Sequence, residues 1–255
     1  MAEWFILLAA VTAGSLVSLI GGLYLIYGKR GVGLLQRIAV PFAAGALLAA
    51  AFLDLLPEAI EHGEPSTVLL YALIGLVTFF VLERSLSWFH HHHEDEKVHV
   101  AGRRNAALVI IGDTVHNLID GMAIGAAFLV DPAVGLVTTV AIAAHEIPQE
   151  IGDFGLLLSK GMSKRKVLLV NVASSLVTVL GASLVYGLAG GLHETESILL
   201  AITAGFFIYI AASDIIPTIH AEPRRKWANI QTLVLLFGIV VVGVAAQIVH
   251  QFLSH

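Results

Sequence analysis

The sequence contains no cysteine and little charge. The absence of cysteine excludes disulfide bonds, thiolate nucleophiles and thiolate metal ligands. Charged residues make up 13% of the 255 residues and hydrophobic residues 57%, whereas ordinary globular chains are roughly 25% charged and about 45–50% apolar. The net charge of −5 and the lack of a basic stripe argue against a nucleic-acid-binding protein. The composition therefore argues against a soluble enzyme and indicates a protein that crosses a membrane several times.

Long apolar stretches account for most of the chain, and each is close to the roughly 20 residues that a spanning helix needs. They show no strict alternation of polar and apolar residues, so we expect helices. The expected spans are at about residues 4–27, 38–60, 67–89, 105–130, 133–158, 167–190, 197–219 and 228–252. The sequence thus predicts an all-α integral membrane protein with eight transmembrane helices in a single domain over residues 1–255. A His-rich cytoplasmic loop is expected over residues 90–104.

The 14 lysines and arginines lie in or beside the first, third, fifth and seventh connections between the expected spans. The other connections and both ends of the chain have none. Cytoplasmic connections of membrane proteins are enriched in Lys and Arg. We therefore expect the odd-numbered connections in the cytoplasm and both termini on the extracytoplasmic side. One missed or false span would break this regular distribution, so it also supports the count of eight.

Two expected spans share a spacing of Gly, Asp and Pro. The segment from Gly45 to Pro57 in the second span matches the segment from Gly205 to Pro217 in the seventh, with Asp54 and Asp214 at the same position. These two spans would cross the membrane in opposite directions, as the copies of an inverted repeat do in secondary transporters. The alternative is a helix-end motif that the chain uses twice.

Eight carboxylates fall within the expected spans, and acidic residues at the centre of a bilayer cost a few kcal/mol each. They are Asp54, Glu58, Asp113, Asp120, Glu146, Glu150, Asp153 and Asp214. Groups of this kind must be protonated, reached by water or neutralised by cations. For Asp54, Glu58 and Asp214, a position near water at a span end is equally consistent with the sequence.

The fourth and fifth spans each carry a stripe of residues that can bind metal. In the fourth span the stripe covers an arc of roughly 100° and in the fifth about 140°. The residues are Asp113, His116, Asn117 and Asp120 in the fourth span, and His145, Glu146, Gln149, Glu150 and Asp153 in the fifth. A very short connection makes the two helices antiparallel neighbours, so the stripes can face each other. Imidazole and oxygen ligands without sulfur suit Zn²⁺, Mn²⁺, Fe²⁺, Co²⁺ or Cd²⁺ and disfavour Cu⁺.

These motifs resemble the signatures of a known family. The segments from His116 to Phe128 and from His145 to Phe154 are similar to the paired signatures of the ZIP (Zrt/Irt-like) divalent-metal transporters. The second segment resembles the H-E-x-P-H-E-x-G-D-F pattern of one large ZIP subfamily, and Ala51 to Ala59 resembles its second-span signature. The histidines of the loop between the third and fourth spans match as well; they are His90, His91, His92 and His93.

The resemblance implies a 3 + 2 + 3 arrangement of helices with an inverted repeat, in which the fourth and fifth spans hold the metal. It also implies import of a divalent cation from outside the cell membrane into the cytoplasm by an elevator-like movement, and a homodimer. The cation is the transported substrate, zinc first, with iron, manganese, cobalt or cadmium as alternatives, and no prosthetic group is expected. The positions that match metal ligands of the family are His116, Asn117, Asp120, His145, Glu146 and Gln149.

Three positions depart from the family pattern. Gln149 stands where the subfamily has His, and a neutral amide coordinates metal weakly and cannot bridge two ions with charge. Asp54 stands where the subfamily has His in the second span, and Asn171 occupies a position that helps to complete a second site in some members. We therefore predict one strong site, with a second site formed by Asn117, Asp120 and Glu146 as the alternative. Asp54, Asp113, Glu150, Asp153 and Asn171 are possible accessory ligands, and so are the loop histidines.

The residues leave other functions open. The sequence His145-Glu146 begins the H-E-x-x-H pattern of zinc hydrolases, but Gln149 replaces the second His, which argues against an intramembrane metallohydrolase. A metal-gated channel or a metal receptor would use the same ligands, and the sequence does not separate either from a carrier. The His-rich loop is either a solvated connection or a cytoplasmic metal-capture site.

Overall fold

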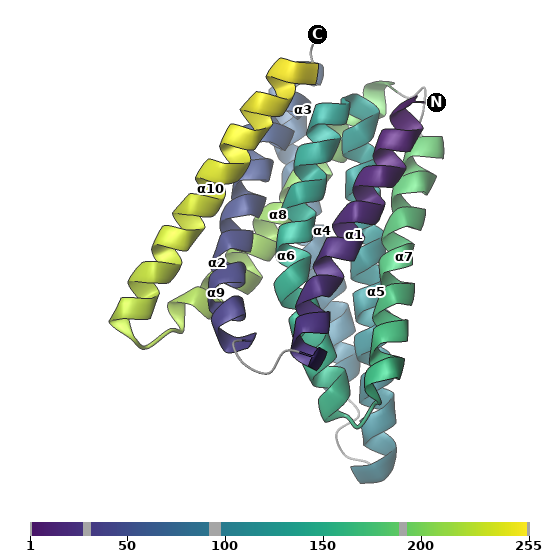
Figure 1. The fold of residues 1–255 in the computed structure, drawn as a ribbon. Helices are drawn as coiled ribbons and strands as arrows, with labels where there is room; N and C mark the ends of the chain where they lie inside the picture. The colour runs from purple at the N-terminus through teal and green to yellow at the C-terminus, as the bar shows by residue number, and fades with distance from the viewer. Residues whose placement is uncertain (1, 28–31, 92–97, 189–192, 254–255) are drawn as a thin grey trace.

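The protein is a bundle of long helices (Figure 1) in a computed structural model that describes residues 2–27, 32–91, 98–188 and 193–253. All regular structure in these residues is helical. The long helices are α1 (Ala2–Tyr27), α2 (Val32–Ala50), α4 (Pro65–His91), α5 (Val98–Val130), α6 (Pro132–Ser159), α7 (Lys164–Leu188), α8 (His193–Tyr209) and α10 (Arg225–Leu253). Two short helices, α3 (Leu56–His62) and α9 (Ile216–His220), each follow a π-helical turn, η1 (Ala51–Leu55) and η2 (Ile210–Ile215).

Six segments of the described chain are long and apolar enough to cross a membrane. They are Glu3–Tyr27, Gly33–His62, Pro65–Ser85, Lys164–Leu188, Glu196–His220 and Arg225–Ile248. They correspond to six of the eight expected spans, and the other two are α5 and α6, which carry the polar stripes. The expectation of an all-helical, multi-pass membrane protein is therefore confirmed. The count of eight spans stays a prediction, because α5 and α6 are not among the helices that are both long and apolar enough to cross a membrane.

The connection between α4 and α5 is shorter than the sequence analysis expected. The expected loop covered residues 90–104, but α4 continues to His91 and α5 already begins at Val98. Residues 98–104 contain no proline, so nothing in the backbone stops the long α5 helix from extending toward its N-terminus. Residues 92–97, and with them His92 and His93, lie outside the described residues, as do the side chains of His90 and His91.

The two copies of the Gly–Asp–Pro spacing adopt the same local structure. Asp54 lies in η1 and Asp214 in η2, and in each copy a proline occupies the first turn of the short helix that follows. Proline lacks a backbone N–H, so the carbonyl one turn earlier loses its helical partner. The π-helical turn widens the backbone at this point. The match in backbone structure agrees with the proposed repeat in these two segments.

By contact, the long helices form two groups of four. One group contains α1, α5, α6 and α7, in which α5 lies along α7 and α1 along α6. The other contains α2, α4, α8 and α10, in which α2 lies along α10 and α4 along α8. The tightest pairs join helices from both halves of the sequence, and the expected 3 + 2 + 3 arrangement stays a prediction.

Glycine residues allow the paired helices within each group to approach closely. A Cβ added to Gly121 on α5 would lie 2.0 Å from the carbonyl oxygen of Thr178 on α7, and one added to Gly45 on α2 would lie 2.1 Å from that of Leu235 on α10. Small residues of this kind let helix backbones approach closely in membranes. Among the described glycines, every such close approach joins helices of the same group, and none joins one group to the other. The contact between the groups is chiefly that of α6 with α2 and α10 and that of α5 with α8.

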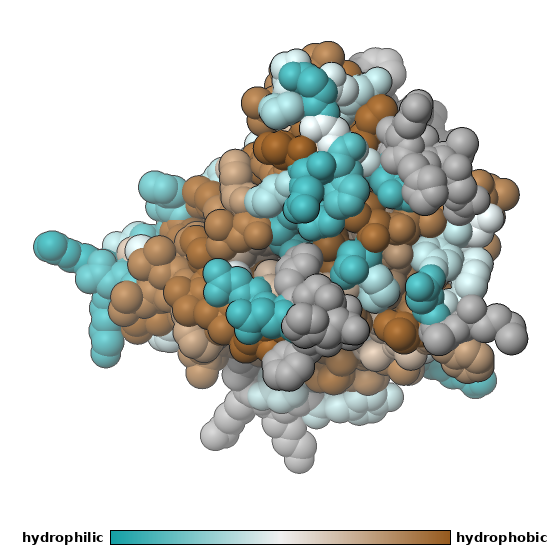
Figure 2. All heavy atoms as spheres, turned by 90° about the horizontal axis from the view of Figure 1, so that it is seen from above, coloured by the Kyte–Doolittle hydropathy of each residue, from teal (hydrophilic) through white to brown (hydrophobic). Residues whose placement is uncertain are grey.

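One end of the bundle carries polar side chains, and its flanks are apolar (Figure 2). Helix α1 begins and α10 ends at the same end of the molecule (Figure 1). Seen from that end, polar side chains gather toward the middle and apolar ones cover much of the periphery (Figure 2). Many large apolar side chains are exposed on the flanks, including Leu69 and Leu73 on α4 and Leu236 and Val240 on α10. A surface of this kind suits contact with lipid tails.

Candidate metal centre

Helices α5 and α6 are joined by one residue. Asp131 caps α6, because its side chain accepts a hydrogen bond of 2.6 Å from the backbone N–H of Ala133, and Pro132 occupies the first helical position. An acceptor at the N-cap and a proline just after it are the strongest local signals for a helix start. The tight turn makes the two helices antiparallel neighbours, as the sequence predicted. Their polar stripes consequently meet inside the bundle.

Four side chains from these stripes converge on one point. His116 and Asp120 from α5 and His145 and Glu146 from α6 each place one ligand atom so that all four atoms lie within 4.8 Å of one another. Asp120, His145 and Glu146 are buried, and His116 is partly exposed to a cavity. Among the described residues, this is the one group of three or more His, Asp or Glu side chains with such spacing.

The spacing within this four-residue cluster suits a small cation. The Nε2 atoms of His116 and His145 lie 3.2 Å apart, and Asp120 Oδ2 lies 3.1 Å from His145 Nε2 and 3.6 Å from His116 Nε2. Ligand atoms at about 2.1 Å from a tetrahedral Zn²⁺ are themselves separated by roughly 3.4 Å. Two imidazoles and two carboxylates form a donor set that zinc and its first-row neighbours prefer. The site can therefore accept such an ion with small side-chain adjustments.

Several atoms of the cluster lack hydrogen-bond partners although they are buried. They are His145 Nδ1, Glu146 Oε1 and Asp120 Oδ2, the last of which lies 3.1 Å from His145 Nε2 without a hydrogen bond to it. Buried polar atoms are nearly always hydrogen-bonded in folded proteins, and an unpaired buried carboxylate is costly. Among the described residues, no Lys or Arg forms an ion pair with the cluster. A bound cation would satisfy these oxygens and neutralise their charge.

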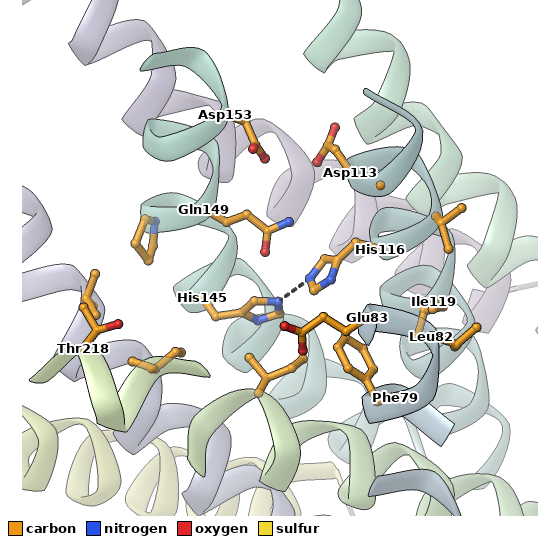
Figure 3. A pocket seen from close by; sticks show the side chains of 16 residues that line it. Phe79, Leu82, Glu83, Asp113, His116, Ile119, His145, Gln149, Asp153 and Thr218 are labelled. Atoms are coloured by element: carbon orange, nitrogen blue, oxygen red, sulfur yellow. Dashed lines mark hydrogen bonds between the residues drawn. The ribbon is translucent and has the colours of Figure 1, made fainter. Parts of the chain in front are cut away.

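A cavity of about 400 Å³ reaches the cluster from one side. It is lined by residues of α2, α4, α5 and α6, by η2 and by α9, and it includes both histidines. Figure 3 shows His116 and His145 facing each other, with Gln149 beside them and Asp113 and Asp153 beyond Gln149. A cation that leaves or reaches the cluster through this cavity passes polar side chains from both helices.

Pro148 and Gln149 shape the wall of this cavity. Pro148 lies inside α6 and leaves the carbonyl of Ala144 without its usual helical N–H partner. Gln149 is half-buried and lines the cavity with its amide. The structure thus brings Gln149 next to the cluster, where a neutral oxygen could supplement the four ligands.

Asn117 does not join the cluster in this conformation. Its amide nitrogen donates to the backbone carbonyl and the carboxylate of Asp113, at 3.1 and 3.0 Å, and to the hydroxyl of Ser174, at 3.2 Å. Its side-chain oxygen accepts a hydrogen bond of 2.7 Å from the hydroxyl of Thr178. Because this oxygen accepts a hydrogen bond from α7 in this conformation, the expectation of Asn117 as a ligand stays a prediction. The helical spacing alone could not separate a ligand from a residue that joins α5 to α7.

The accessory residues lie outside the four-residue cluster. Asp54 is buried in η1, and Asn171 is buried on α7, where its amide donates a 2.8 Å hydrogen bond to the carbonyl of Val167. On α5, Asp113 precedes the cluster residues, and on α6, Glu150 and Asp153 follow them. Because the two helices are antiparallel, all three lie toward the turn that joins α6 to α7. The loop histidines fall on side chains that are not described.

The sequence analysis did not identify the contribution of α4. Phe79 packs edge-on against the ring of His116, with ring centroids 5.8 Å apart. Glu83, one turn further along α4, lines the cavity and points toward the histidines (Figure 3). Glu83 stands beside Arg84 near the end of an apolar span, so it resembles an ordinary interfacial charge. Only the packing of α4 against α5 brings it to the site.

The chain was compared with known protein families and with individual proteins. It matches the family described as ZIP Zinc transporter over residues 2–107 and 89–246. It is 34% identical to zinc transporter ZIP13 of Pongo abelii over 218 residues, which are 80% of this chain and 64% of that protein. It is 32% identical to human zinc transporter ZIP10 over 206 residues, 73% of this chain and 23% of ZIP10, and 42% identical to human zinc transporter ZIP4 over 122 residues, 47% of this chain and 18% of ZIP4. The matches thus span less than two thirds of each of these relatives.

Proposed function

The chain belongs to the ZIP family of zinc transporters, and we propose that it imports zinc across the cell membrane into the cytoplasm. The relatives named above are zinc transporters, so the substrate we propose first is Zn²⁺. Iron, manganese, cobalt and cadmium are alternative cargo, because nitrogen and oxygen ligands accept them too. Membership in a family of transporters also argues against the metallohydrolase alternative.

One observation carries this proposal. The four-residue cluster is buried between two helices of a membrane protein, lacks basic partners among the described residues, and opens to a cavity on one side. Structural zinc sites are closed and fully coordinated by the protein. A site that a cavity reaches from one side is better suited to taking up and releasing an ion.

Two features support alternating access as the mechanism. The cluster lies wholly on α5 and α6, which belong to one group of helices, whereas Phe79 and Glu83 on α4 approach it from the other group. Close glycine contacts hold each group together but, among the described glycines, do not cross the boundary between them. We propose that the group of α1, α5, α6 and α7 moves against the other and carries the metal. Movement of one helix group against another is the general form of alternating access, and here the moving group would take the metal site with it.

The proposed topology has eight spans, both termini outside the cytoplasm, and α5 and α6 as the two spans that hold the metal. This topology agrees with the positions of Lys and Arg in the described connections, because the α6–α7 and α9–α10 connections lie away from the end at which α1 begins (Figure 1). We further propose a homodimer, in line with the family resemblance.

Saturable uptake tests the proposed function. The purified protein is reconstituted in liposomes that contain a zinc-sensitive dye, and zinc is added outside. A carrier gives uptake that saturates with zinc concentration and exceeds that of protein-free liposomes, and it produces no single-channel currents. Unitary ohmic currents would show a channel instead. Zinc binding without any uptake would indicate a receptor.

A further inference from the structure

A second set of carboxylates lies next to the four-residue cluster and plays no part in it. Asp113 on α5 and Glu150 and Asp153 on α6 lie one to two turns closer to the turn that joins α6 to α7. Glu150 and Asp153 stand about one helical turn apart on α6. Asp113 and Asp153 line the same cavity as the two histidines, and Figure 3 shows them on opposite sides of it. We refer to Asp113, Glu150 and Asp153 as the carboxylate triad.

The carboxylates of the triad lack basic partners among the described residues, although they lie in the interior of a membrane protein. Glu150 is 1% exposed, and neither of its carboxylate oxygens has a hydrogen-bond partner. Asp113 is buried too and accepts a hydrogen bond from Asn117. Among the described residues, no Lys or Arg is paired with any of the three. A buried carboxylate without a partner is stable only when a cation or a proton accompanies it.

Neutral polar groups from α7 complete the surroundings of the triad. The hydroxyl of Ser174 accepts a hydrogen bond from the amide of Asn117, which also donates to Asp113. One turn earlier on α7, Asn171 is buried and its side-chain oxygen has no hydrogen-bond partner. Oxygen atoms are thus the only potential ligands that these residues offer, whereas the four-residue cluster offers two imidazole nitrogens as well.

We infer that the carboxylate triad is a second cation site, which receives a partly hydrated divalent ion as it leaves the four-residue cluster. The triad does not meet the close spacing of that cluster, so a single bare ion would not touch all three carboxylates, and water would supply the remaining ligands. Sites that combine carboxylates with several waters suit hard ions and bind Zn²⁺ less tightly than imidazole does. This inference rests on the proposed function, because it gives the released ion its next position along the cavity.

The position of the triad fits release on the proposed cytoplasmic side. It lies between the four-residue cluster and the α6–α7 turn, which carries Lys160 and Lys164 and belongs to the basic end of the bundle. A weak site at this position lowers the cost of moving a divalent ion away from the histidines. It also holds no nitrogen ligand that would retain zinc.

Manganese binding to purified variants in detergent tests the inference without requiring transport. Mn²⁺ prefers oxygen ligands, and its bound and free forms are distinguished by electron paramagnetic resonance. In the His145→Ala variant, which weakens the four-residue cluster, we expect one weaker Mn²⁺ site to remain. Adding Glu150→Gln or Asp153→Asn to this variant should lower its Mn²⁺ affinity by at least about tenfold, as loss of metal-supporting groups commonly does. Adding Glu61→Gln, an exposed carboxylate of α3, should leave the affinity unchanged.

Two results would overturn the inference. One is a His145→Ala variant that binds no Mn²⁺, and the other is a Mn²⁺ affinity that neither Glu150→Gln nor Asp153→Asn lowers. Zinc binding by the single variants Glu150→Gln and Asp153→Asn, in which the four-residue cluster is intact, shows that they fold. If the wild-type protein took up no zinc while the triad variants lost Mn²⁺, the proposed function would fail and the second site would stand. Saturable zinc uptake by the wild-type protein with unchanged Mn²⁺ affinity in the triad variants would instead support the proposed function and overturn the second site.

Discussion

At the scale of single residues, position on a helix face does not decide the role of a side chain. Asn117 and Asp120 lie on the same stripe of α5, yet Asp120 joins the histidines and Asn117 is held by α7. The difference arises because the stripe is wide enough to face two neighbouring helices. The side of the stripe toward α6 meets His145, and the side toward α7 meets Ser174 and Thr178.

Replacing Glu146 by Gln should remove most of the zinc affinity. Glu146 is buried within the cluster, and one of its oxygens has no hydrogen-bond partner. The amide keeps the shape of the side chain but loses the charge that attracts the cation, so we expect zinc affinity to fall by more than about tenfold and uptake to be lost. Equilibrium dialysis with radioactive zinc measures the affinity. Glu61→Gln is the matched control, and equal affinity in the two variants would refute the role of Glu146.

Replacing Thr178 by Val should destabilise the protein without removing a ligand. The hydroxyl of Thr178 donates to the side-chain oxygen of Asn117, and the variant leaves this buried acceptor unpaired. An unsatisfied buried acceptor costs about 1–3 kcal/mol. Thermal unfolding in detergent should show a lower midpoint for Thr178→Val. The control Thr232→Val changes an exposed threonine on α10 whose hydroxyl bonds only within its own helix, and a loss of stability as large as that of Thr178→Val would contradict this account.

At the scale of helices, backbone proximity explains which elements pair. Gly121, Gly125 and Gly181 bring α5 and α7 together closely enough that an added Cβ would overlap a backbone carbonyl of the opposite helix. This contact holds the helix that carries His116 and Asp120 against a rigid neighbour. It thereby fixes the position along the bundle axis at which these two ligands meet α6.

Replacing Gly121 by Ala should separate α5 from α7. The new Cβ would lie 2.0 Å from the carbonyl oxygen of Thr178, a backbone atom that cannot turn aside. Overpacking of this kind typically costs about 1–3 kcal/mol, and we expect a lower unfolding temperature in detergent together with weaker zinc binding. Gly112→Ala is the control on the same helix, because its Cβ would meet no atom within 4 Å. The account would be wrong if the two alanine variants unfolded at the same temperature.

Much of the site could be predicted from the sequence, and the reasons are local. His116, Asp120, His145 and Glu146 stand at helical spacings on neighbouring spans, and one connecting residue forces those spans together. The contribution of Glu83 could not be predicted, because it depends on how α4 approaches α5 from another part of the chain. The division of the helices into two groups could not be predicted from the sequence either, because it depends on which glycines contact the backbone of which helix.

At the scale of the whole molecule, the Lys and Arg distribution makes a prediction about topology. Because the chain has no cysteine, a single introduced cysteine can be labelled without interference. A cysteine at His62, at the end of α3, should react with a membrane-impermeant maleimide added to intact cells, whereas one at Lys160 should react only after the membrane is opened. Both residues are exposed, so burial does not limit the reaction. The reverse pattern, or labelling of both from outside, would contradict the proposed orientation.

The central claim is that the four-residue cluster carries zinc across the membrane. Its most direct test compares zinc uptake by the wild-type protein and the His145→Ala variant in liposomes that contain a zinc-sensitive dye. His145 Nε2 lies within 3.2 Å of both His116 and Asp120, so its loss should disrupt the cluster. We predict saturable uptake by the wild-type protein and none above background in the variant. Equal uptake by the two proteins would contradict the assignment of the transport site.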